Sequence, residues 1–126
     1  MSGYLALGHY LLEGKKSFAD SWNFGPSNEN NVTVLELVRQ AQVHWDKISF
    51  EFDKGKHPHE AGFLMLDSSK AIKLLHWQPV WGFNRTVEQT IEWYKAFYEK
   101  GEIKSLEILQ QYVAEARAKE ISWSKY

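Results

Sequence analysis

The side chains best suited to polar chemistry lie in one loop, His57-Pro58-His59-Glu60. Two imidazoles and a carboxylate can hydrogen-bond a bound ligand, and the same groups are also metal ligands. A zinc site needs a fourth ligand and outer hydrogen-bonding partners, which this loop does not supply. Two interpretations stay open for His57, His59 and Glu60: a ligand-contacting loop, or a turn in which His59 or Glu60 caps a neighbouring backbone group. We predict no metal site.

A second cluster, Asp67-Ser68-Ser69-Lys70, combines hydroxyls with an amine. Residues one or two apart on a helix do not face each other, so Ser–Lys nucleophilic chemistry is poorly arranged here. Aspartate and serine oxygens are, however, favoured helix N-caps. We therefore predict that Asp67 and Ser68 cap a helix.

The elements that must position these loops follow from hydrophobic spacing and from stop signals. Apolar residues at helical spacing, with caps or breakers at the ends, predict five helices: Ser2 to Gly14, one capped by Thr33 with Glu36 in a capping box, one after Ser68 that ends before Pro79, Asn84 to Lys100, and Ser105 to about Glu120. Short apolar or alternating runs predict three strands: Ser21 to Phe24, Ile48 to Phe52, and Phe63 to Leu66. The predicted fold class is α+β, mostly helical.

Composition limits the classes of protein to consider. The chain has 126 residues, 44% of them hydrophobic and 25% charged, which predicts a soluble globular domain. Its net charge of −1 offers no strong field to nucleic acid or to anionic lipid. There is no cysteine and no apolar run of the roughly 20 residues that span a bilayer. We expect a cytoplasmic protein with no nucleic-acid or membrane partner.

A longer pattern surrounds the histidine loop: HPHEAGFLMLDSSKAIKLLHWQPVW, from His57 to Trp81. Upstream stand SGYLALGHYLLEG and SWNFGPSNENNVTVLELV, and downstream stands the helix segment Thr86 to Tyr94. From about Ser2 to Tyr112 the chain resembles the C-terminal part of CDP-glucose 4,6-dehydratases, which are extended short-chain dehydrogenase/reductases. The D-x-SKA and L-x-W-x-P patterns recur throughout that superfamily, whereas PHEA together with WNFGP is more specific. One departure is His76, where the family usually has glycine.

The resemblance implies a fragment that lacks the cofactor-binding Rossmann domain. Residues 1–26 would belong to that missing domain, and residues 27–126 would form the substrate-binding domain. The family uses NAD to convert CDP-glucose to CDP-4-keto-6-deoxyglucose, and PHEA implies that His57, His59 and Glu60 border the sugar-nucleotide site. No glycine-rich dinucleotide turn and no Tyr-x-x-x-Lys pair occurs in the sequence, so no catalytic or cofactor-binding residue is carried over.

We therefore expect the sugar-nucleotide-binding part of such an enzyme, inactive alone. Two alternatives stay open: a non-catalytic sugar-nucleotide-binding module, and an interaction subunit that completes a separately encoded Rossmann half. Without the missing domain, the apolar residues of the first segment would repack or stay exposed, among them Tyr4, Leu7, Leu11 and Trp22. Exposed apolar surface favours association, which predicts a homo-oligomer.

Overall fold

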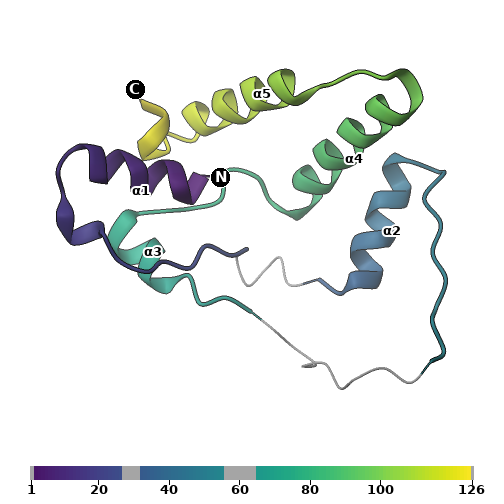
Figure 1. The fold of residues 1–126 in the computed structure, drawn as a ribbon, viewed down its shortest axis with the longest axis horizontal. Helices are drawn as coiled ribbons and strands as arrows, with labels where there is room; N and C mark the ends of the chain where they lie inside the picture. Colours follow the sequence, from purple (N-terminus) through teal and green to yellow (C-terminus); the bar gives the residue numbers. More distant parts are fainter. Residues whose placement is uncertain (1, 27–31, 56–64, 126) are drawn as a thin grey trace.

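Helices make up nearly all the regular structure of the residues that the computed structural model describes, 2–26, 32–55 and 65–125 (Figure 1). In chain order the elements are α1 (Ser2–Leu12), the 3₁₀ turn η1 (Lys16–Phe18), α2 (Val34–His44), α3 (Ser69–Leu75), α4 (Phe83–Lys100), α5 (Ser105–Ala118) and the 3₁₀ turn η3 (Ser122–Lys125). The five predicted helices are thus confirmed, with ends that differ from the predicted ones by up to two residues.

Local capping chemistry accounts for several helix ends. The N–H of Thr33 donates to Glu36 Oε2 at 2.7 Å, and the N–H of Glu36 donates to Thr33 Oγ1 at 3.2 Å, which is the predicted capping box of α2. Gly101, with φ +71°, takes the left-handed C-cap of α4. Gly14, with φ +77°, follows α1 in the same way.

The helix α3 begins at Ser69, as predicted, but its capping differs in part from prediction. Asp67 Oδ1 accepts a 2.9 Å hydrogen bond from the N–H of Ser69, so the prediction for Asp67 is confirmed. Ser68 occupies the N-cap position but makes no side-chain cap, because its hydroxyl is used elsewhere in the fold. At the other end His76 takes the left-handed C-cap with φ 49° and ψ 35°, a conformation that favours glycine.

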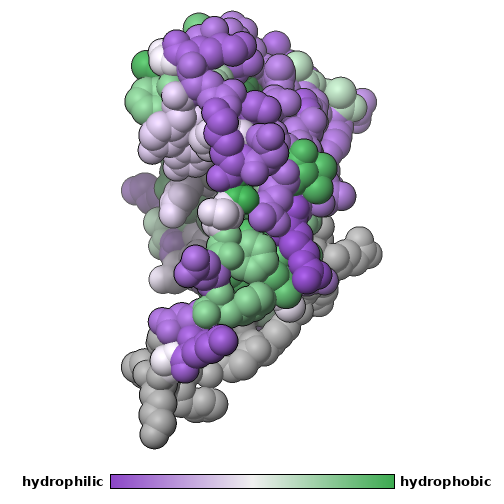
Figure 2. Space-filling model, turned by 90° about the vertical axis from the view of Figure 1, so that its right-hand side faces the viewer, coloured by the Kyte–Doolittle hydropathy of each residue, from purple (hydrophilic) through white to green (hydrophobic). Residues whose placement is uncertain are grey.

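The prediction of strands is wrong for the described residues. Ser21 to Phe24 and Ile48 to Phe52 are irregular, and so are Met65 and Leu66, which end the third predicted strand. An alternating pattern indicates a half-buried surface, but a strand also needs the backbone of a neighbour for its hydrogen bonds. No such neighbour occurs in the described chain, and Phe50 and Phe52 stay exposed. On the face shown in Figure 2, hydrophobic side chains are exposed, mainly in its lower part.

The first of two small cores holds residues from both ends of the chain. Ala6 of α1, Ala71 and Leu75 of α3, and Trp77 are buried together, and α1 packs against α3 and η3. Around them lie partly buried hydrophobic residues: Leu7, Tyr10, Phe18, Trp22, Phe24 and Trp123. This core joins residues on both sides of residue 26. The division of the chain into 1–26 and 27–126 stays a prediction.

The second core lies beside the first. Val80, Ala116 and Ile121 are buried there, with Trp81 and Tyr112 packed around them. Trp123 contacts both cores and therefore links α5 and η3 to the α1–α3 region. Of the apolar residues expected to lose their partner, Leu7 and Trp22 pack on the first core, whereas Tyr4 and Leu11 stay exposed.

Candidate functional site

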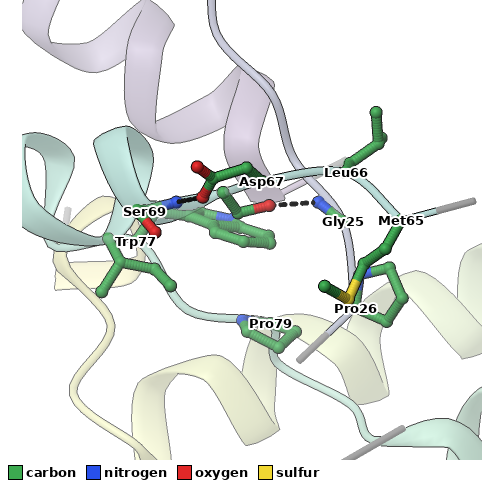
Figure 3. A pocket seen from close by; sticks show the side chains of 10 residues that line it. Gly25, Pro26, Met65, Leu66, Asp67, Ser69, Trp77 and Pro79 are labelled. Carbon is green, nitrogen blue, oxygen red and sulfur yellow. Dashed lines mark hydrogen bonds between the residues drawn. The ribbon is translucent and has the colours of Figure 1, made fainter. Parts of the chain in front are cut away.

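The predicted site residues His57, His59 and Glu60 lie outside the described residues. The described chain instead brings together three other motif segments: Trp22 to Pro26, Leu66 to Lys70, and Trp77 to Pro79. Between them is a pocket of about 420 Å³ (Figure 3). It is lined by Gly25, Pro26, Met65, Leu66, Asp67, Ser68, Ser69, Ile72, Trp77 and Pro79.

The backbones of the first two segments, Trp22 to Pro26 and Leu66 to Lys70, lie close together. The N–H of Gly25 donates to Ser68 Oγ at 2.9 Å across 43 residues of sequence, and Ser68 is buried (Figure 3). A Cβ on Gly25 would stand 3.1 Å from Leu66 Cβ, so a larger residue there would push the segments apart. The glycine of the WNFGP segment is thus needed for close approach, which is one of the standard uses of glycine.

Trp77 forms a buried wall of the pocket. Its Nε1–H donates to Ser2 Oγ at 2.9 Å, which satisfies the polar atom of an otherwise apolar side chain. The ring of Phe24 meets it edge-on, with centroids 5.2 Å apart. Phe24 in turn lies directly against Gly3 of α1. The indole therefore holds α1, the Trp22 to Pro26 segment and α3 in one arrangement.

Lys70 ties the same segments together outside the pocket. Its Nζ lies 2.6 Å from Asp20 Oδ2, donates to the carbonyl of Ser21 at 3.0 Å, and stands 4.5 Å from the centroid of the Trp22 ring. The hydrogen bond from Lys70 lowers the pKa of the Asp20 carboxyl, and so does the N–H of Ser21. The lysine of the D-x-SKA pattern is thus part of a structural ion pair in the described chain.

Asp67 supplies the charge at the pocket. The Ser69 hydroxyl and the Ser69 N–H hydrogen-bond its carboxylate and lower its pKa, so the group is ionised at neutral pH. An ionised carboxylate accepts hydrogen bonds from hydroxyl groups and repels phosphate. The remaining lining is mostly apolar, and the volume lies in the range of small-molecule sites. The pocket suits an uncharged, hydroxyl-rich ring more than an anion.

A second pocket, of about 480 Å³, adjoins the first. The two share lining residues Gly25, Pro26, Leu66, Trp77 and Pro79. The second extends to α1, to Trp81 and to Thr86 near the start of α4. Aromatic side chains also line the second pocket, among them Tyr4, Trp22 and Trp81.

Sequence reasoning did not identify this pocket as a site. Its segments were recognised as motifs, but Trp22 to Pro26 lies about 40 to 55 residues before the other two, and their contact is a property of the fold. The signal that could have found them is the glycine of WNFGP, because close approach needs a partner segment. Among the residues that the structure describes, no group of acidic, histidine or cysteine side chains could hold a metal ion. Nor is any helix in this part of the chain long and apolar enough to cross a membrane.

Comparison with known proteins gives one informative relationship. Over 98 residues, 77% of this chain, the sequence is 39% identical to CDP-glucose 4,6-dehydratase of Salmonella typhimurium strain LT2. The matched region covers 27% of that protein, so this chain spans about a quarter of its relative's length. No family model matches the chain. The identity indicates common ancestry with a sugar-nucleotide dehydratase.

Proposed function

We propose that this chain is the sugar-nucleotide-binding part of a CDP-glucose 4,6-dehydratase-like enzyme and is inactive by itself. The observation that carries the proposal is the convergence of three motif segments on one pocket. They come from the resemblance to the dehydratases, and the relative that shares 39% identity bears that name. The relationship to the dehydratases suggests a sugar nucleotide as the ligand. The pocket, with Asp67 in its lining, is suited to bind the hydroxyls of the sugar.

The proposed substrate contacts are His57, His59 and Glu60, together with Asp67. The three loop residues follow from the resemblance of PHEA to the family's sugar-nucleotide site. Imidazoles donate to phosphate and carbonyl oxygens, and carboxylates accept from hydroxyls. Asp67 would accept hydrogen bonds from sugar or ribose hydroxyls, because its negative charge repels phosphate. No residue of this chain is proposed to be catalytic.

The parent family uses NAD, but the described residues do not fit a dinucleotide. Pyrophosphate binding needs a glycine-rich turn that leads from a strand into a helix. None of the helices in the described ranges follows a strand, and α2 has its first N–H groups satisfied by its own capping box. We derive no step through NAD in this chain.

Two alternatives differ in what the chain does alone. A non-catalytic module would bind CDP or CDP-glucose as its whole function. An interaction subunit would bind little until it meets a separately encoded Rossmann half, and a neighbouring reading frame would encode that half. The closed contact between Gly25 and Ser68 favours a pocket that is formed in this chain by itself.

Calorimetric titration of the chain with CDP-glucose tests the proposal. We expect saturable binding that His59→Ala and Asp67→Asn each weaken about tenfold, the loss of one charge-assisted hydrogen bond. The matched control is His44→Ala, which removes a histidine of α2 that does not line the pocket. Titration with NAD should give no binding. Saturable NAD binding, or CDP-glucose binding that both His59→Ala and Asp67→Asn leave unchanged, would refute the proposal.

A further inference from the structure

The helix α1 has large apolar residues on two opposite sides, although only one of these sides is covered. Toward the core it presents Gly3, Ala6, Leu7 and Tyr10. On the opposite side it presents Tyr4, Leu5, Gly8, Leu11 and Leu12, which we call the outer face. The large residues of the outer face are all exposed, Tyr4 by 76% and Leu12 by 91%. An uncovered apolar helix face is typical of an interaction surface.

We propose that the outer face is a two-fold interface, on which α1 of a second copy of this chain packs antiparallel with the two Gly8 residues at the axis. The sequence of the face is symmetric about Gly8. Large apolar residues stand three and four positions before it, Leu5 and Tyr4, and three and four positions after it, Leu11 and Leu12. Rotation by half a turn about Gly8 places Tyr4 against the partner's Leu12 and Leu5 against the partner's Leu11. An interface between identical patches requires this self-complementarity.

The open space around Gly8 leaves room for a second helix at the two-fold axis. A Cβ built on Gly8 meets nothing within 4 Å, so the absence of a side chain is not required by packing inside the chain. Glycine inside a helix costs about 1 kcal/mol relative to alanine. A bare backbone at the centre of an apolar face lets a second helix approach closely. Gly8 therefore has a role in the pair that it lacks in the single chain.

The lack of charged side chains on the outer face is also compatible with a second copy of the chain. The segment Ser2 to Leu12 contains no aspartate, glutamate, lysine or arginine, and its one ionisable group near neutral pH is His9. Two copies of the outer face therefore meet without like charges. Antiparallel packing places the negative end of each helix dipole beside the positive end of the other.

The area fits a weak dimer. Large side chains expose about 150 to 250 Å² each when fully accessible. With the exposures of Tyr4, Leu5, Leu11 and Leu12, the outer face offers roughly 500 Å² per chain, and a pair buries about 1,000 Å². That total lies at the lower limit of specific interfaces, so the dimer forms as concentration rises. Tyr4 also lines the second pocket, but the inference does not depend on the sugar-nucleotide function, and its tests measure mass and covalent linkage.

A cysteine placed at the axis tests the geometry, because the chain has no cysteine of its own. Two Gly8→Cys chains paired in this way bring their Cα atoms within reach of the roughly 4.4 to 6.8 Å that a disulfide spans. We expect Gly8→Cys to form a covalent dimer rapidly under mild oxidation. The control Ser49→Cys, exposed in the segment after α2, should stay mostly monomeric. Equal cross-linking of the two variants would overturn the proposal.

A second variant tests the face without an added thiol. Leu12→Lys changes a side chain that is 91% exposed, so the fold should survive, as circular dichroism would show. Sedimentation equilibrium should show a concentration-dependent dimer for the natural chain and a monomer for Leu12→Lys. Leu106→Lys, on the exposed surface of α5, should still dimerise. A natural chain that is monomeric at its highest soluble concentration, or a dimer that Leu12→Lys leaves intact, would assign the face to another occupant, such as a separately encoded chain.

Discussion

The pocket region and the α2–α4 pair are stabilised by different kinds of contact. In the pocket region, hydrogen bonds join residues far apart in sequence: Trp77 to Ser2, 75 residues away, and Gly25 to Ser68, 43 residues away. Both involve buried or half-buried groups. In α2, by contrast, the hydrogen bonds that cap the N-terminus join Thr33 and Glu36, which are three residues apart. Among the described residues of α2, only Ala41 is buried.

Just after α2, Trp45 and Lys47 contact α4 near the surface. Trp45 stacks on Tyr98 with centroids 6.2 Å apart, and its Nε1–H donates to Glu99, which also pairs with Lys47 at 2.8 Å. Exposed ion pairs of this kind contribute little to stability, because water and salt screen them. The pocket should therefore form and be lost with the global fold, whereas α2 should respond mainly to local changes. The predictions below test that difference, from the largest expected effect to the smallest.

Truncation of a core tryptophan should separate the two regions most clearly. Trp77→Ala removes a side chain that is 7% exposed and leaves a cavity between α1 and α3. The expected loss is about 3 to 5 kcal/mol in the free energy of unfolding, a large part of the total for a domain of this size. Urea denaturation followed by circular dichroism measures it. Trp45→Ala, a half-exposed tryptophan of the α2–α4 pair, should cost about 1 kcal/mol. Equal losses would mean that the two regions are equally buried.

Alanine substitutions at two glycines of α1 should change the free energy of unfolding in opposite directions. A Cβ on Gly3 would stand 2.4 Å from the Phe24 ring, which packs on Trp77, so Gly3→Ala should destabilise by about 1 to 3 kcal/mol. Gly8 has open space around it, so Gly8→Ala should stabilise the monomer by about 0.5 to 1 kcal/mol. Thermal or urea unfolding at dilute, monomeric concentration measures both. Stabilisation by Gly3→Ala would show that Phe24 is free to move.

The capping box of α2 predicts a local, pH-dependent effect. Thr33→Ala should reduce the free energy of unfolding by about 1 kcal/mol. The N–H and the hydroxyl of Thr33 lower the pKa of Glu36 below its ordinary value of 4.5. Because the folded pKa is the lower one, this contribution is present above about pH 4.5 and is lost as pH falls through the folded value. Urea unfolding at a series of pH values should show a smaller acid loss in Thr33→Ala than in the natural chain. An unchanged pH profile would contradict the assignment.

Features coded within a few residues were predictable from the sequence, and features that depend on distant partners were not. The Thr33–Glu36 box and the end of the fourth helix at Lys100 were predicted because the residues that determine them are close together in sequence. Ser68 has the composition of a cap, but the amide of Gly25 takes its hydroxyl, and nothing near Ser68 in sequence indicates this. The prediction of strands was wrong for the same reason, because the alternating pattern of Ile48 to Phe52 does not indicate whether a second strand lies beside it. The pocket depends on two such distant contacts, from Gly25 to Ser68 and from Trp77 to Ser2.

One measurement tests the central claim, that the converged motif segments form a sugar-nucleotide pocket in this chain alone. It is the change in amide chemical shifts on addition of CDP-glucose. The account predicts changes concentrated at pocket amides such as Gly25, Asp67 and Ser69, with the amides of α2 near Glu36 and Ala41 unchanged. Changes confined to α2, or no changes at saturating CDP-glucose, would contradict it.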